Sequence, residues 1–331
     1  MAILNVFKPP VAYMPFETAL LAISMGNASF VNWINCHFVQ LGINMVQDSI
    51  TGVVTPTLYF VDTLDEMDIY SIPSKMLGKF DRQKSFSDYI NHFVERGFYI
   101  FLYVDEYYLP NYDNYQINHD MHPILIYGIK DNEVYIADFF RQGMYTFEKC
   151  TVKEVDAAVH FLNSNRFGRE DKESDVILLK PVVDEYVFDK SMLKTGIVSY
   201  LHSRSIEGKK QTQKYQFYGL TNYHMLLDYF QKMKFVTDRI DYRMLSFHTT
   251  HKKLMLDKLL ALQEIDIKSA KKYAELANSF KNVLRLCQLN LSLALKYNTK
   301  TNNELITRIC NNIDIIRDEE KRILEDVVSL L

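Results

Sequence analysis

The chain has 331 residues and a formal net charge of -3, and hydrophobic residues make up 48% of it against 24% charged residues. This length allows one large or two ordinary domains with cores of their own, and this charge excludes a general affinity for nucleic acid or anionic membranes. The four cysteines lie far apart, and neither an apolar run of membrane-spanning length nor a charged, cleavable leader is present, so we expect a cytoplasmic protein with reduced thiols.

Helical and strand patterns are mixed up to about residue 188. Pro15 and Gly26 predict a helix that begins at the proline and stops at the glycine, and apolar periodicity predicts further helices over 35–48 and 85–95. Strand-like runs follow at 98–108, 122–129, 133–140, 144–148 and 175–181. Helices followed by a mostly antiparallel sheet indicate an α+β fold for a core of residues 1–188.

From residue 189 nearly every segment has helical period. Helices are predicted over 189–203, 221–234, about 241–297 with a break near 264–268, and 301–327. Charged and polar residues predict an exposed loop at 163–175 and a connector at 206–214. We therefore expect a helical region, residues 189–331, behind the core.

The segment NHDMHPILIYGIKDNEVYIADFF, residues 118–140, has the pattern of a β-hairpin with His122 near one end and Asp138 near the other. A two-residue turn at Asp131-Asn132 would place the two side chains on opposite faces. A three-residue loop that includes Lys130 would pair Ile124 with Asp138 and bring His122 diagonally beside the carboxylate. This second register predicts a histidine base that is oriented by an aspartate.

Cys36 is the candidate nucleophile for this pair. Asn35 is a plausible N-cap of the helix predicted over 35–48, which would place Cys36 in the first turn, where the helix dipole lowers a thiol pKa. The order Cys36, His122, Asp138, with the nucleophile on a helix and the other two on adjacent strands, is the papain-like arrangement. We expect the other cysteines to be core residues: Cys150, Cys287 and Cys310.

Four segments resemble the papain-like family typified by the N-terminal part of butirosin biosynthesis protein H: WINCHFVQL (33–41), FYIFLYVDEYYLP (98–110), HDMHPILIYGI (119–129) and VYIADFF (134–140). The resemblance covers most of the chain and implies a papain-like fold with Cys36, His122 and Asp138 as catalytic residues. Members of the family accompany natural-product pathways and move acyl groups from carrier-protein thioesters onto amines. In relatives the nucleophile can lie nearer the first helix, but the corresponding stretch here, YMPFETALL, contains no cysteine.

The resemblance also implies the partners and the cofactor requirement. We expect an acyl or peptidyl carrier protein, whose phosphopantetheine arm carries the substrate, a small amine or diamine acceptor, and no cofactor or metal of the enzyme's own. The glutamine that papain-like enzymes place before the nucleophile is absent. Three asparagines are therefore the candidates for completing the oxyanion hole: Asn27, Asn32 and Asn35.

Further candidates surround the hairpin. Asp105 and Glu106 are positioned to bind a cationic amine, His119 to line the same cleft, and nearby tyrosines to stack on an aryl acyl group: Tyr107, Tyr108, Tyr112 and Tyr115. Alternatively, these carboxylates are solvated and the tyrosines pack in the core. His119 and His122 with nearby aspartates (Asp113, Asp120 and Asp138) give a weak metal pattern.

Two other functions remain open. The chain would be a papain-like peptidase or thioesterase if water were the acceptor, and a catalytically silent carrier-binding protein if Cys36 were inert. The helical region has clustered basic residues that would suit an acidic carrier protein, or form a solvated helix face with Glu264 and Glu275. These are His251, Lys252, Lys253, Lys258, Lys268, Lys271, Lys272 and Lys281.

Overall fold

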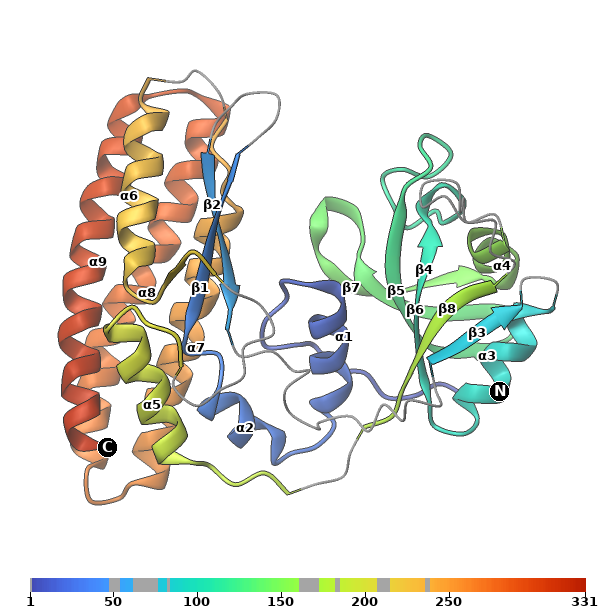
Figure 1. Ribbon diagram of the computed structural model, residues 1–331, viewed down its shortest axis with the longest axis horizontal. Helices are drawn as coiled ribbons and strands as arrows, with labels where there is room; N and C mark the ends of the chain where they lie inside the picture. The colour runs from blue at the N-terminus through green and yellow to red at the C-terminus, as the bar shows by residue number, and fades with distance from the viewer. Residues whose placement is uncertain are drawn as a thin grey trace. The chain divides into compact units, whose positions relative to one another are not determined.

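The computed structural model describes residues 2–47, 54–61, 77–81, 84–160, 173–181, 185–206, 215–235 and 239–331 (Figure 1). The chain forms two compact units, Met1–Ala28 with Leu64–Glu185, and Ser29–Thr63 with Tyr186–Leu331. The boundary expected at 188 lies close to the observed one, but residues 29–63 belong to the second, mainly helical unit. Most of the loop expected at 163–175 and of the connector expected at 206–214 lies outside the described residues.

The first unit is built on a six-stranded antiparallel sheet with the order β3-β8-β4-β5-β6-β7. Its strands are β3 (Leu77–Asp81), β4 (Tyr99–Asp105), β5 (Met121–Lys130), β6 (Glu133–Phe139), β7 (Tyr145–Thr151) and β8 (Glu173–Leu179). Its helices are α1 (Pro15–Ser24), α3 (Phe86–Val94) and α4 (Val152–His160), with short 3-10 turns η3 (Glu106–Tyr108) and η4 (Arg141–Gly143). The sequence predictions of an α+β fold, of helices α1 and α3 and of strands β4 to β8 are confirmed.

Each face of this sheet packs against different helices. Ile100, Ile124 and Ile136 join residues of α3 and α4 in one core cluster. Phe101, next along β4, contacts Phe16 of α1 at 5.1 Å between ring centroids. Because side chains alternate along a strand, His122 and Asp138 lie on the same face as Ile124 and Ile136.

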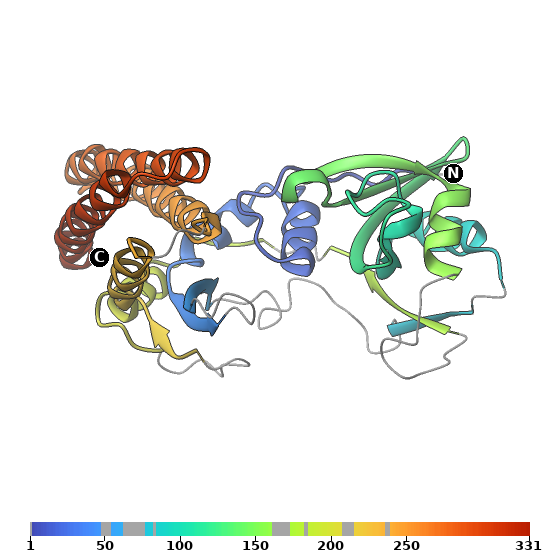
Figure 2. The ribbon, with the colours of Figure 1, turned by 90° about the horizontal axis from the view of Figure 1, so that it is seen from above.

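In its described residues, the second unit combines a three-stranded antiparallel sheet with six helices. The sheet order is β2-β1-β9, with β1 (Leu41–Gln47), β2 (Val54–Phe60) and β9 (Phe217–Tyr218). The helices are α2 (Phe30–Cys36), α5 (Lys190–Leu201), α6 (Thr221–Met233), α7 (Arg243–Ile265), α8 (Ala270–Thr299) and α9 (Asn303–Leu330). The helices predicted over 189–203, 221–234, about 241–297 with a break near 264–268, and 301–327 are confirmed, and α8 packs against both α7 and α9 (Figures 1 and 2).

The helix predicted over 35–48 is wrong. Helix α2 ends at Cys36, Phe38 has a left-handed backbone with a φ of 56°, and the chain continues as strand β1. Gln40 is fully buried, donating to the Arg204 carbonyl at 2.6 Å and accepting from the Leu41 amide at 2.9 Å. An apolar run of this length fits a buried helix or a buried strand equally well, and pairing with β2 decides between them.

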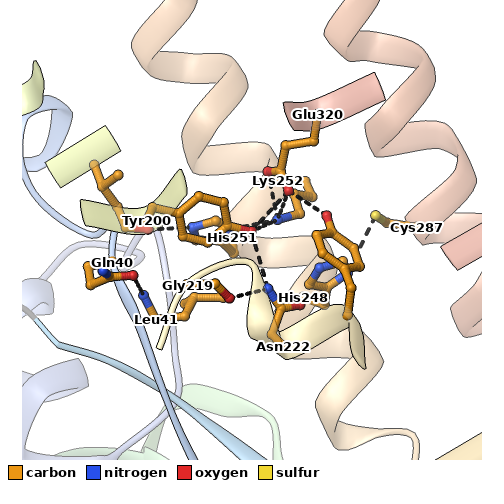
Figure 3. A network of polar contacts seen from close by, with 12 residues as sticks. Gln40, Leu41, Tyr200, Gly219, Asn222, His248, His251, Lys252, Cys287 and Glu320 are labelled. Carbon is orange, nitrogen blue, oxygen red and sulfur yellow. Dashed lines mark hydrogen bonds and ion pairs between the residues drawn. The ribbon is translucent and has the colours of Figure 1, made fainter. Parts of the chain in front are cut away.

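A fully buried ion pair lies at the centre of the second unit (Figure 3). Lys252 Nζ lies 2.7 Å from Glu320 Oε1, and Oε2 of the same carboxylate accepts from the hydroxyls of Tyr200 at 2.9 Å and Tyr223 at 2.5 Å. The charges therefore have the hydrogen-bond partners that buried charges require. The network joins helices α5, α6, α7 and α9.

The expectation that the bases of α7 form one exposed cluster is wrong for three of them. Lys252, His251 and Lys258 are at most 1% exposed. His251 Nε2 donates to the Val39 carbonyl at 2.8 Å, so Nδ1 accepts from Lys252 Nζ at 2.9 Å and the ring is neutral. Accordingly, burial and the Lys252 charge lower the pKa of His251 well below 6.5.

Candidate acid–base site

The β5–β6 hairpin brings His122 and Asp138 together through a register shift. Its turn is the two-residue one, with Lys130 opposite Glu133 and positive φ at both Asp131 and Asn132. The register shifts between Ile126 and Gly128, so that Leu125 lies opposite Ala137. The three-residue loop predicted from the sequence is wrong, but one extra residue in β5 has the same effect on the faces of the strands as one extra residue in the loop would have.

His122 and Asp138 are in direct contact, as the sequence predicts. His122 Nδ1 lies 2.5 Å from Asp138 Oδ2, and the His122 side chain is 30% exposed while that of Asp138 is 1% exposed. The Tyr112 hydroxyl donates to the same oxygen. A buried carboxylate therefore orients the ring, and Nε2 is the nitrogen left to exchange a proton with a substrate.

The surroundings of His122 raise its pKa. Burial by itself lowers its pKa, but the hydrogen bond to Asp138 and the charges of Asp138 and Glu106 outweigh this effect and raise the pKa above 6.5. The same surroundings act on Tyr112, where burial and the Asp138 charge raise the pKa of the phenol well above 10, so that it remains a donor. His122 therefore has the surroundings of a general base whose ring is held in one tautomer by Asp138.

Glu106 is a second carboxylate near His122. Its Oε2 accepts from Asn114 Nδ2 at 2.6 Å, and burial, opposed by this hydrogen bond and by the His122 charge, raises the pKa of the carboxyl group. Among the predicted substrate-binding residues, Glu106 interacts electrostatically with both His122 and Asp138.

The other predicted substrate-binding residues form a second histidine–carboxylate pair. His119 Nδ1 lies 2.7 Å from Asp105 Oδ2, and the imidazole stacks on Tyr107 with 4.2 Å between ring centroids. Asp105 is 1% exposed and also accepts from the Tyr107 amide, which caps η3. Tyr108 packs edge-on against Tyr107. These contacts stabilise the loop that follows β4. Both carboxylate oxygens of Asp105 are used in them, one by His119 and one by the Tyr107 amide.

Cys36 is not where the sequence argument places it. It is the last residue of α2, not the first-turn residue of a helix, and it belongs to the second unit, whereas His122 and Asp138 belong to the first. Its Sγ accepts from the Asp189 amide at 3.0 Å, and it is 4% exposed. Burial raises the pKa of the thiol despite the opposing Asp189 amide and the Lys258 charge. A helix C-terminus also disfavours a thiolate.

The remaining cysteines and the asparagines have structural contacts. Cys150, Cys287 and Cys310 are buried, and burial raises the pKa of each, that of Cys287 to about 12. Asn32 Nδ2 donates to the Tyr186 carbonyl at 2.9 Å, Asn35 is 7% exposed, and the Asn27 amide donates to the Ser24 carbonyl. Asn32 and Asn35 lie in the second unit with Cys36, and Asn27 lies in the first.

Tyr112 is the site residue whose role the sequence did not reveal. The sequence suggests it only as one of several tyrosines for stacking, because its contact with Asp138 depends on the path of the loop from η3 to β5. For the buried bases of α7 a signal does exist, since His248, Lys252 and Leu259 share one face with Met255 at spacings of three and four residues.

Comparison with known proteins gives no family: the chain matches no protein-family model and no curated protein. The described residues contain no group of three His, Cys, Asp or Glu side chains able to hold a metal ion. None of the helices within the described ranges has the length and apolar character needed to cross a membrane.

Proposed function

We propose that this chain is an acyltransferase that forms amides, with a papain-like fold, in which His122 is the general base. The observation that carries the proposal is the 2.5 Å contact between His122 Nδ1 and buried Asp138 in a side chain that is still 30% exposed. The structure supplies the coarser feature, helices packed on an antiparallel sheet, and the papain-like fold itself is proposed from the sequence resemblance. The substrate and its carrier follow from the sequence resemblance.

In the proposed reaction, an amine nitrogen attacks the carbonyl carbon of a thioester on a carrier protein's phosphopantetheine arm. His122 Nε2 takes the proton that the nitrogen loses, and Asp138 stabilises the resulting imidazolium. The C–S bond then breaks, and the thiolate leaving group takes the proton from His122. Atoms and charges balance without a cofactor.

Under this proposal the acceptor is a diamine, which attacks through an unprotonated nitrogen and carries its positive charge on the other nitrogen. The first unit has 14 lysines and arginines against 23 aspartates and glutamates, a formal charge of -9, which attracts cations to the unit that contains His122. Within the family, the sequence resembles the amide-forming enzyme of closthioamide assembly, which acylates a small diamine, and we propose an acceptor of that class. The carrier protein and a natural-product pathway belong to the same proposal.

A second route to the same product passes through an acyl-enzyme on Cys36. The Asp189 amide and the Lys258 charge favour it, because each stabilises a thiolate at Sγ. The net effect of burial is opposite, and helix α2 places the thiol at its C-terminal end, so direct attack by the amine is the route that the local geometry favours.

The test is product analysis by mass spectrometry with an acyl-pantetheine thioester and a diamine. The proposal expects amide, with a loss of roughly 10²–10⁴-fold in His122→Ala, the usual contribution of a positioned base. The matched control is His160→Ala, which should leave activity unchanged, because His160 also contacts an aspartate, Asp156, but on helix α4. Free acid as the sole product would favour a thioesterase, and full activity in His122→Ala would remove the proposal.

A further inference from the structure

Helix α8 differs from its neighbours in charge. It has five basic residues, Lys271, Lys272, Lys281, Arg285 and Lys296, all exposed, against a single acidic residue, Glu275. Lys271 and Lys272, which the sequence analysis grouped with Lys268 as clustered bases, are exposed on the surface, unlike the buried bases of α7. The exposed surface of this helix is therefore basic.

Four of these bases form a continuous ridge. At 3.6 residues per turn, Lys271, Lys281, Arg285 and Lys296 fall within about a third of the helix circumference and extend along about 40 Å. Exposed Asn278 and Ser292 occupy the same sector. We call Lys271, Lys281, Arg285 and Lys296 the basic ridge.

The neighbouring helix α9 shows how a solvated charged face is usually balanced. Arg317 lies 2.9 Å from Asp314, and Arg322 lies 3.0 Å from Glu319. Within the described part of the chain, no residue of the basic ridge forms an ion pair of this kind. The ridge thus carries positive charge that its own unit does not neutralise.

The net charge of the second unit is also positive. The second unit has 24 lysines and arginines against 18 aspartates and glutamates, a formal charge of +6, although the chain as a whole has -3. A positive patch on a positive unit attracts an acidic partner over the Debye length of about 8 Å at physiological salt.

We propose that the basic ridge is the docking surface for an acidic protein, which, on the proposed function, is the protein that delivers the acyl thioester. Nucleic acid fits less well, because no aromatic side chain on the ridge is available for stacking and the first unit has a charge of -9. An anionic membrane also fits less well, because Leu295 is the one large apolar side chain exposed on α8, whereas a surface helix is anchored by several.

The test measures binding by fluorescence anisotropy, using the full chain and an acidic acyl carrier protein with a fluorescent acyl-phosphopantetheine arm. The variant is Lys281→Glu with Arg285→Glu, and the matched control reverses two exposed charges on α9, Arg308→Glu with Lys321→Glu. We expect binding that weakens with salt, an affinity about 10-fold lower in the ridge variant, and a change below about 2-fold in the control.

Equal affinity in the ridge variant and the wild type would overturn the proposal, as would undetectable binding by the wild type. The same holds if the ridge variant instead loses binding to a DNA duplex or to phosphatidylserine vesicles, or loses self-association in sedimentation. Because anisotropy needs no turnover, ridge-dependent binding without any amide product would disprove the proposed function and leave the ridge intact.

Discussion

Replacing Asp138 by asparagine isolates the contact on which the proposed chemistry depends. The amide keeps the size of the side chain but removes the negative charge that faces His122 Nδ1 at 2.5 Å and replaces one of the two acceptor oxygens by an NH2 donor. A hydrogen bond between charged groups contributes about 1.5–3 kcal/mol, so kcat should fall roughly 10- to 150-fold if the contact acts mainly in the transition state.

The same substitution changes the titration of His122 in a defined direction. Since Asp138 raises the pKa of His122, Asp138→Asn should lower the titration midpoint, and the rate should rise with pH at lower pH than in the wild type. Tyr112→Phe should act oppositely, because Asp138 Oδ2 then gives its full charge to the imidazolium. The imidazole signals can be followed by NMR, with His122 assigned by the signal that disappears in His122→Gln.

The titration of His122 also affects the stability of the fold. A histidine with a raised folded pKa stabilises the fold fully below pH 6.5 and loses this contribution as pH rises through the folded value. Asp156→Asn, beside His160, is the control that should leave the His122 signal in place. The reasoning is refuted if Asp138→Asn leaves the midpoint unchanged, or if both site variants move it in the same direction.

Three further outcomes are expected, the last two measured by fluorescence of Trp33, the one tryptophan of the chain, which is buried in the second unit. On the direct route, Cys36→Ala retains amide formation and peptide mapping finds no acyl group at position 36; an adduct there, abolished by the substitution, would establish the acyl-enzyme instead. Lys252→Met leaves the Glu320 charge unpaired and should lower the free energy of unfolding of the unit by about 3–5 kcal/mol, measured in urea. Lys253→Met, at the exposed neighbouring position, should lower it by less than about 1 kcal/mol, and equal effects of the two substitutions would contradict this reasoning. The pKa values of His248 and His251, both in this unit, are lowered well below 6.5 in the fold, so the unfolded chain binds two extra protons. Unit stability should therefore fall by about 2.7 kcal/mol per pH unit below pH 6.5, and a flat profile would count against buried neutral rings.

The sequence by itself determined the elements whose signals are local. The start of α1 at Pro15, the end of α3 before Gly97 and strands β4 to β8 follow from proline and glycine geometry and from period-two alternation, which act over a few residues. The contact between His122 and Asp138 was also predictable, because a hairpin confines two segments to a small set of registers. The sequence did not reveal whether the turn or a bulge produces this register, since a longer loop and a β-bulge give the same alignment of His122 with Asp138.

Tertiary structure decided the features that depend on distant partners. The run 37–47 became a turn and a strand because β2 and residues 216–218 pair with it, and no signal within the run distinguishes this from a helix. Cys36 therefore ends a helix, and the dipole argument for its reactivity reverses sign. The sequence places Lys252 on an apolar face of its helix but does not reveal its partner, because Glu320, 68 residues later, provides the buried countercharge. Such pairings are set by packing between remote segments, because a charge is buried only where the folded chain supplies its partner.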